Sequence, residues 1–131
     1  MGEFLKSLDV SSSGLKAQSQ RLRHTAENIA NADTPGYRRK TVEFKMVHDG
    51  GRGGVGLVET GKVSLDQTEL ERIYDPSNPL ADSSGYFDGS NVDLVIEIAD
   101  AREAQRSYEA NLKMFDQARQ MSSSLMELLR R

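Results

Sequence analysis

Hydrophobic residues near the start of the chain recur every seven positions, at Leu8, Leu15, Leu22 and Ile29. The residues between them are mostly small or polar. This spacing predicts a helix with a narrow apolar seam, which is typical of a helix that packs against one or two partners. Gly14 costs a helix about 1 kcal/mol relative to alanine. We therefore expect the first part of this helix to fray when the chain is alone.

The first helix is expected to end near Ala32. Pro35 disfavours a helical conformation at Thr34, and Pro35 followed by Gly36 is a turn signal. These two residues are predicted to redirect the chain outward. Asn31 is predicted either to bind the last helical carbonyls or to adopt a left-handed conformation.

The middle of the chain is predicted to be rich in short strands. Residues 41–46 alternate between polar and apolar, which predicts a strand with one buried face. Glycines then predict a loop. The remaining expectations are a loop over 48–56, strands over 55–60, 63–67 and 70–74, and a loop over 75–90 that is anchored by Tyr86 and Phe87.

A second helix is predicted from Asn91, as the N-cap, to Arg130, because residues 91–130 contain neither Gly nor Pro. Apolar residues follow it in two stripes, one at Leu94, Ile98, Ala101, Tyr108, Leu112 and Phe115, the other at Met114, Ala118, Met121, Leu125 and Leu128. This helix of about 58 Å is longer than a compact chain of this size, which is about 36 Å across. Its uncovered apolar face therefore indicates an interaction surface.

These elements predict an α+β chain. Residues 1–36 form a helix and a redirecting turn, residues 37–90 a small β-rich domain, and residues 91–131 a long helix. The long helix is predicted to pack with residues 1–36 as a coiled-coil-like layer.

Composition and charge narrow the possible functions. The 131 residues carry 17 basic and 20 acidic side chains, a net charge of −3, which suits one domain. The absence of cysteine excludes disulfides and thiolate metal sites. No apolar run approaches the length of about 18 residues that a membrane span needs, so no membrane insertion is expected. The first residues lack the apolar stretch of a cleavable secretory signal.

Candidate catalytic and binding residues are few. The two histidines, His24 and His48, have no second ligand at helical spacing, so neither a metal site nor another cofactor is expected. The motif Ser13-x-x-Lys16 lacks the companion motifs of acyl-transfer enzymes. Glu97, Asp100 and Glu103 are expected to form a solvated helix face. We therefore expect no catalytic site, no small-molecule substrate and no enzymatic activity.

Three consecutive basic residues, Arg38, Arg39 and Lys40, allow two interpretations. They could contact the phosphates of a nucleic acid, which requires several such contacts. They could also be a solvated strand edge, where charge discourages wrong pairing. Because the whole chain is acidic, the second interpretation is favoured and nucleic acid is not an expected partner.

Two segments resemble the signatures of bacterial flagellar rod and hook proteins. Residues 28–37 resemble the sequence that closes the first helix of this family, with Asn28, Asn31, Thr34, Pro35, Gly36 and Tyr37 at the characteristic positions. Residues 103–111 resemble the signature of its C-terminal helix, with Arg106, Ala110 and Asn111. The short length and residues 74–79, 84–86 and 91–92 resemble the proximal-rod member, although Ser90 stands where proline is expected.

This resemblance implies a structural subunit of the proximal rod, part of a hollow axial drive shaft that transmits torque and lets exported subunits pass. It implies a place in the periplasmic part of the basal body, reached through the flagellar type III export apparatus without a cleaved signal. The expected partners are other rod subunits, basal-body proteins and neighbouring copies of the chain. Tyr37 is expected to anchor the turn. The residues expected to pack helices in the assembly are Leu8, Leu15, Leu22, Ile29, Leu94, Ile98, Tyr108, Leu112, Phe115, Met121, Leu125 and Leu128.

Three alternatives remain open. The chain could be another axial subunit of the rod, because the two ends are shared across the family. It could be a cytosolic coiled-coil adaptor, which a secretion assay would distinguish. A small hydrolase is the third alternative, and no catalytic constellation supports it.

Overall fold

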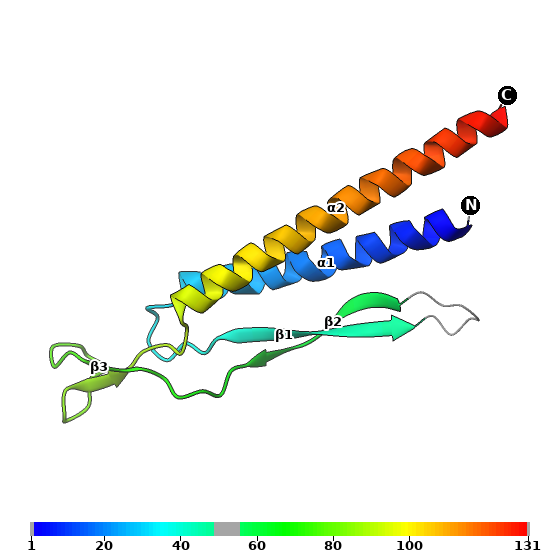
Figure 1. The fold of residues 1–131 in the computed structure, drawn as a ribbon. Coiled ribbons are helices and arrows are strands. Elements are labelled where there is room, and N and C mark those ends of the chain that lie inside the picture. The colour runs from blue at the N-terminus through cyan, green and yellow to red at the C-terminus, as the bar shows by residue number, and fades with distance from the viewer. Residues whose placement is uncertain (1, 49–55, 131) are drawn as a thin grey trace.

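The structure is a computed structural model that describes residues 2–48 and 56–130. Two long helices, α1 (Gly2–Ala30) and α2 (Leu94–Arg130), lie side by side in antiparallel directions. Between them in sequence come β1 (Lys40–His48), β2 (Gly56–Leu65), β3 (Arg72–Tyr74) and β4 (Tyr86–Asp88). Figure 1 shows β1 and β2 running along α1, and the β3–β4 hairpin beyond the end of the helices that is opposite the chain termini. The predicted α+β architecture is confirmed.

Small side chains form the contact between the two helices. The buried hydrophobic residues of the described chain are only Ala17, Ala104 and Ala118. The helices approach each other closely at Gly14, where an added Cβ would lie 2.7 Å from Oδ1 of Asn111. The other buried residues of the two helices are Ser11, Gly14, Thr25, Asn28 and Glu97.

The large apolar residues predicted to pack helices lie at the edge of this contact or outside it. Leu8, Leu15, Leu22, Tyr108 and Phe115 are partly buried. Ile29, Leu94, Ile98, Leu112, Met121, Leu125 and Leu128 are each more than a third exposed. Leu112, for example, is 41% exposed and is not fully buried between the two helices of one chain. The hydrophobic positions that are buried between the helices are occupied by small side chains, Ala17, Ala104 and Ala118. Whether these large residues act in assembly stays a prediction.

The strands differ from the predictions in three ways. The two strands predicted over 55–60 and 63–67 are one strand, β2, which pairs antiparallel with β1. The register of this pair shifts between Val42 and Phe44, which indicates a β-bulge. The predicted buried face of β1 is also wrong, because Phe44 is 39% and Met46 is 71% exposed. Finally, β4 occupies part of the predicted loop and pairs with β3. Most of the loop predicted over 48–56 lies outside the described residues.

The helix ends lie close to their predicted positions. Helix α1 ends at Ala30, two residues before the expected end. Helix α2 begins at Leu94, and its N-cap is Asp93, whose Oδ1 accepts a hydrogen bond from the N–H of Val95 at 3.0 Å. Asn91 is therefore not the cap, and its side chain has a different role, described below. Neither α1 nor α2 combines the length and the apolar character that a membrane span requires.

Candidate functional site: the polar junction and the exposed helix faces

The turn that follows α1 is built by its signature residues. Nδ2 of Asn31 donates a hydrogen bond to the carbonyl of Glu27 at 2.8 Å, which satisfies one of the last helical carbonyls. Oγ1 of Thr34 donates to Oδ1 of Asn31 at 3.1 Å. Gly36 has a φ of 74°, a conformation that favours glycine. Asn31 therefore binds a helical carbonyl, which is the first of its two expected roles. It does not adopt the left-handed conformation, because no described residue other than glycine has a positive φ.

This turn also holds the base of the β3–β4 hairpin. The N–H of Gly36 donates to the carbonyls of Asp88 and Gly89, at 3.2 and 3.1 Å. Ser90 donates through Oγ to the carbonyl of Ala32, and the N–H of Asn91 donates to the carbonyl of Tyr37 at 3.3 Å. The redirecting turn therefore sets the position of the hairpin as well as the end of α1.

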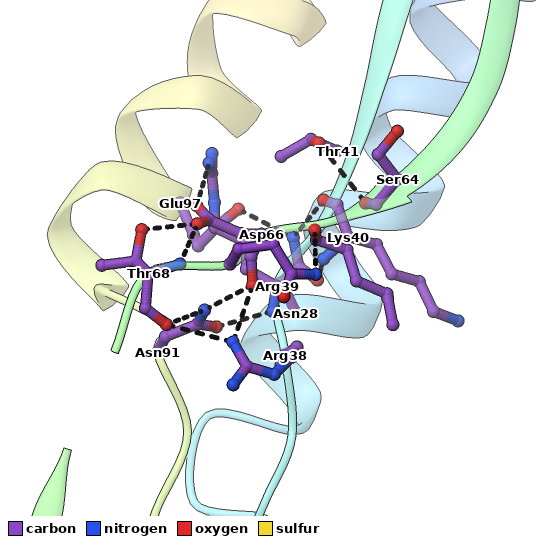
Figure 2. A network of polar contacts seen from close by, with 12 residues as sticks. Asn28, Arg38, Arg39, Lys40, Thr41, Ser64, Asp66, Thr68, Asn91 and Glu97 are labelled. Atoms are coloured by element: carbon purple, nitrogen blue, oxygen red, sulfur yellow. Dashed lines mark hydrogen bonds and ion pairs between the residues drawn. The ribbon is translucent and has the colours of Figure 1, made fainter. Parts of the chain in front are cut away.

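The side chain of Asn28 is 1% exposed and uses both ends of its amide. Oδ1 accepts hydrogen bonds from the N–H of Lys40 and from the hydroxyl of Tyr37, both at 2.9 Å. Nδ2 donates to the carbonyl of Lys40 at 3.0 Å and to Oε2 of Glu97 at 3.4 Å. Burial raises the pKa of Tyr37, which keeps its hydroxyl protonated as a donor. Asn28 therefore joins α1 to the first residue of β1 (Figure 2).

Asn91 binds the backbone of Arg39, the residue before Lys40. Its Oδ1 accepts a hydrogen bond from the N–H of Arg39 at 2.7 Å. Its Nδ2 donates to the carbonyls of Asp66 and Thr68, at 3.0 and 3.1 Å. The guanidinium of Arg38 binds the same two carbonyls, each at 3.2 Å. Two asparagines, Asn28 from α1 and Asn91 from the segment before α2, therefore fix the start of β1 (Figure 2).

The guanidinium of Arg39 ties the strand to α2. It forms ion pairs with Glu97, with Asp100 at 2.9 Å and with Asp66 at 3.8 Å. Partial burial disfavours its charge, but the hydrogen bond to Glu97 and the three carboxylates outweigh this and raise the pKa of Arg39. Glu97 is 1% exposed, so removal of Arg39 would leave a buried carboxylate without its cation.

These contacts correct two predictions. The basic triplet is not a solvated strand edge, because Arg38 and Arg39 bind as described and Nζ of Lys40 lies 2.8 Å from Oε2 of Glu27. Glu97 and Asp100 do not form a solvated helix face, since both bind Arg39. We call this cluster, Asn28, Tyr37, Arg39, Lys40, Asp66, Asn91, Glu97 and Asp100, the polar junction. Sequence reasoning missed Arg39, Asn91 and Glu97, because nothing in their local spacing reveals partners so far apart in the chain.

The polar junction has the arrangement of a structural clamp. Its carboxylates bind arginine or lysine, and its amides bind backbone groups. Within residues 2–48 and 56–130, no group of three histidine, aspartate or glutamate side chains is placed to hold a metal ion. The polar junction can therefore fix the orientation of β1 relative to α1 and α2.

The signature residues of α2 have different surroundings. Nδ2 of Asn111 donates to the carbonyl of Ser107 at 2.8 Å, and its side chain lies against Gly14. Arg106 and Ala110 are exposed. The contact of Asn111 with Gly14 explains why α1 has a glycine at this position. The structure of one chain reveals no role for Arg106 or Ala110.

Comparison with known proteins identifies the family of this fold. The family described as "Flagella basal body rod protein" matches residues 8–38, and the family described as "Flagellar basal body rod FlgEFG protein C-terminal" matches residues 83–128. These ranges contain the redirecting turn and nearly all of α2.

Several similar proteins bear one name, flagellar basal-body rod protein FlgC. The protein of Agrobacterium fabrum is 46% identical over 128 residues, which cover 92% of this chain and 91% of the relative. Those of Escherichia coli O6:H1 and Salmonella typhimurium are 37% and 36% identical over 131 residues, which cover 95% of this chain and 97% of each relative. The chain therefore belongs to the FlgC family of flagellar basal-body rod proteins.

Proposed function

We propose that this chain builds the proximal rod through the exposed apolar faces of its two helices, which pack against neighbouring subunits. As a member of the FlgC family, it is a structural subunit of the basal-body rod, and other rod components and further copies are its partners. The proposal concerns the surfaces that carry this assembly.

The observation that supports it is the distribution of apolar side chains on α1 and α2. The helices bury alanines between them, while side chains as large as Leu112, at 41%, and Leu128, at 66%, remain exposed. Exposed apolar surface of this extent on a soluble chain is typical of an interaction site.

The apolar stripe of α1 and the first apolar stripe of α2 lie on one face of the helix pair, whereas the second stripe of α2, which contains Met121, Leu125 and Leu128, lies on the other. At about 100° per residue, the stripe of Leu8, Leu15 and Leu22 is displaced from the contact positions of α1 in one rotational sense. Leu94, Ile98 and Leu112 are displaced from those of α2 in the same sense, so in an antiparallel pair both stripes face the same side. The residues of α1 that bind β2, Ser13 and Gln20, are displaced in the opposite sense. The β1–β2 pair therefore lies on one side of α1 and leaves the side with Leu8, Leu15 and Leu22 open.

Within this proposal the chain works after export to the periplasmic part of the basal body, through the flagellar type III apparatus and without a cleaved signal. It carries torque through packed contacts and performs no chemical step. In a helical tube, each subunit would present different surfaces to its neighbours above and beside it.

Electron microscopy of basal bodies tests the proposal directly. A strain that lacks the chain should form rings without a completed rod, and the wild-type gene should restore the rod. Intact hooks and filaments in the deletion strain would contradict it and would favour the cytosolic adaptor.

A further inference from the structure

The β3–β4 hairpin is the part of the chain with the least internal support. Each of its strands has three residues, and β3 and β4 contact only each other among the described helices and strands. A two-stranded hairpin of this kind is marginal in water by itself. Only its base is held, by the bonds of Gly36 to Asp88 and Gly89. Its outer surface therefore lies free, away from the helix pair (Figure 1).

One face of this hairpin is aromatic and acidic. Tyr74 and Tyr86 are cross-strand partners with ring centroids 5.1 Å apart, and they are 63% and 41% exposed. Asp88 shares this face, because it is two residues from Tyr86 along the strand. Arg72, the cross-strand partner of Asp88, shares this face, and its guanidinium lies 5.7 Å from the centre of the Tyr86 ring. It already binds Asp82 at 2.6 Å, whereas Asp88 has no ion pair with a described residue.

The charge around this face is strongly negative. Residues 66–93 contain seven acidic side chains and one basic side chain, Arg72. The exposed Leu80, at 64%, adds apolar surface in the connection between the strands. A complementary partner would offer an apolar centre with cations around it.

The outer side of α2 has these properties. A shallow hollow there is lined by Val95, Ile98 and Ala99, with Arg102 and Arg106 beside them. Val95 is 76% exposed, and neither arginine has an ion pair with a described residue. Glu103, the acidic residue of this hollow, already faces Arg21 at 3.4 Å. Arg106 is also the signature residue that lacks a role within one chain.

We propose that the β3–β4 face of one copy docks into the α2 hollow of a second copy. Tyr74 and Leu80 would cover Val95 and Ile98, and Asp88 would face the arginines, which also bind tyrosine rings favourably. The two surfaces are different, so the contact is heterologous and leaves a free surface of each kind at the ends, as an open assembly requires. This inference rests on the proposed function and specifies one of its contacts.

Crosslinking in assembled rods tests this contact, since the chain has no cysteine of its own. Leu80→Cys and Val95→Cys variants, expressed together in the deletion strain, should give a dimer on oxidation of isolated basal bodies. Each variant alone should give none. The pair Met46→Cys and Val95→Cys is the matched control, because Met46 is equally exposed but lies in β1.

The outcomes separate the contact from the function. A Leu80–Val95 dimer without a control dimer supports the contact. Normal rods without that dimer, or a dimer of Val95→Cys alone, overturn it while the proposed function stands. Absence of the wild-type chain from isolated rods would overturn both. As a second measurement, Arg106→Asp should reduce the amount of chain in rods at least threefold, and Asp88→Arg in a coexpressed copy should restore part of it; equal incorporation of Arg106→Asp contradicts the contact.

Discussion

The side-chain amide of Asn28 pairs with the backbone of Lys40 in the way that a neighbouring strand would. Its Oδ1 accepts from the N–H of Lys40 at 2.9 Å, and its Nδ2 donates to the carbonyl of Lys40 at 3.0 Å. One helical residue thus supplies both hydrogen bonds of a strand position. The start of β1 is therefore fixed to α1 by polar contacts.

Asn28→Asp should destabilise the chain by at least about 2 kcal/mol. The carboxylate loses both donors, leaves the carbonyl of Lys40 without this partner and faces the buried Glu97, and each buried unsatisfied group costs about 1–3 kcal/mol. Urea unfolding followed by circular dichroism measures the change. Asn78→Asp is the matched control, because Asn78 acts as an acceptor toward the N–H of Leu80 and aspartate keeps that role. A loss below about 0.5 kcal/mol for Asn28→Asp, the range of ordinary surface changes, would contradict this role.

Gly14→Ala should weaken the contact between the helices although alanine favours a helix. The gain in helix propensity is at most about 1 kcal/mol, whereas overpacking costs about 1–3 kcal/mol. The new Cβ would lie 2.7 Å from Oδ1 of Asn111, whose side chain is also held by the carbonyl of Ser107.

A double-mutant cycle with Asn111→Ala separates the two effects. The second substitution removes the overlapping atoms, so Gly14→Ala should be neutral or stabilising in that background. Equal effects of Gly14→Ala in both backgrounds would mean that the close approach does not limit the helix contact.

Acid should weaken the connection between β2 and the polar junction. Hydrogen bonds from Thr68, together with the charges of Arg39 and Arg38, hold the pKa of Asp66 below its usual value. The stabilisation is complete above the pKa of an unfolded aspartate, about 3.9, and is lost as the pH falls through the lower folded pKa. Asp66→Asn should therefore be less stable than the wild type at neutral pH, and the difference should shrink as the pH falls below the pKa of an unfolded aspartate. Thermal unfolding across this range checks the prediction, and a constant difference at all pH values would contradict it.

Replacement of Pro35 and Gly36 by alanines should misplace the middle domain. Alanine is strained at the φ of 74° found at Gly36, and without Pro35 the helix is free to continue. If Gly36 moves, its two bonds to the base of the β3–β4 hairpin are lost. Strongly reduced swarming in soft agar is expected from the doubly substituted chain, with Gly2→Ala, where an added Cβ meets no atom within 4 Å, as the control. Normal swarming would exclude the redirecting role.

Local patterns were sufficient to predict the helices and the turn, but not the contacts between distant segments. Helix ends follow from proline, glycine and capping residues nearby, so α1 and α2 were placed within a few residues. The polar junction depends on Arg39 meeting Glu97, which lies 58 residues further along the chain. The periodicity of hydrophobic residues does not indicate which polar residues will pair over such a distance.

The sequence pattern also did not reveal which residues the two helices bury between them. Heptads of leucine identify an apolar stripe but not its partner, and here Gly14, Ala104 and Ala118 provide the contact within the chain. The family resemblance indicated the function more directly than any single element did, because its motifs lie in the turn and in α2.

Leu112→Asp should block incorporation into the rod while leaving export intact. Leu112 is 41% exposed, so the substitution removes little packing within the chain, but it places a charge on the apolar face proposed to meet a neighbour. Phe115→Asp should have the same effect and, because Phe115 is partly buried, should also reduce stability. Immunoblots of isolated basal bodies measure incorporation, and blots of the exported fraction measure export. Equal incorporation of Leu112→Asp and the wild-type chain would place Leu112 on solvent in the rod and would require another surface for assembly.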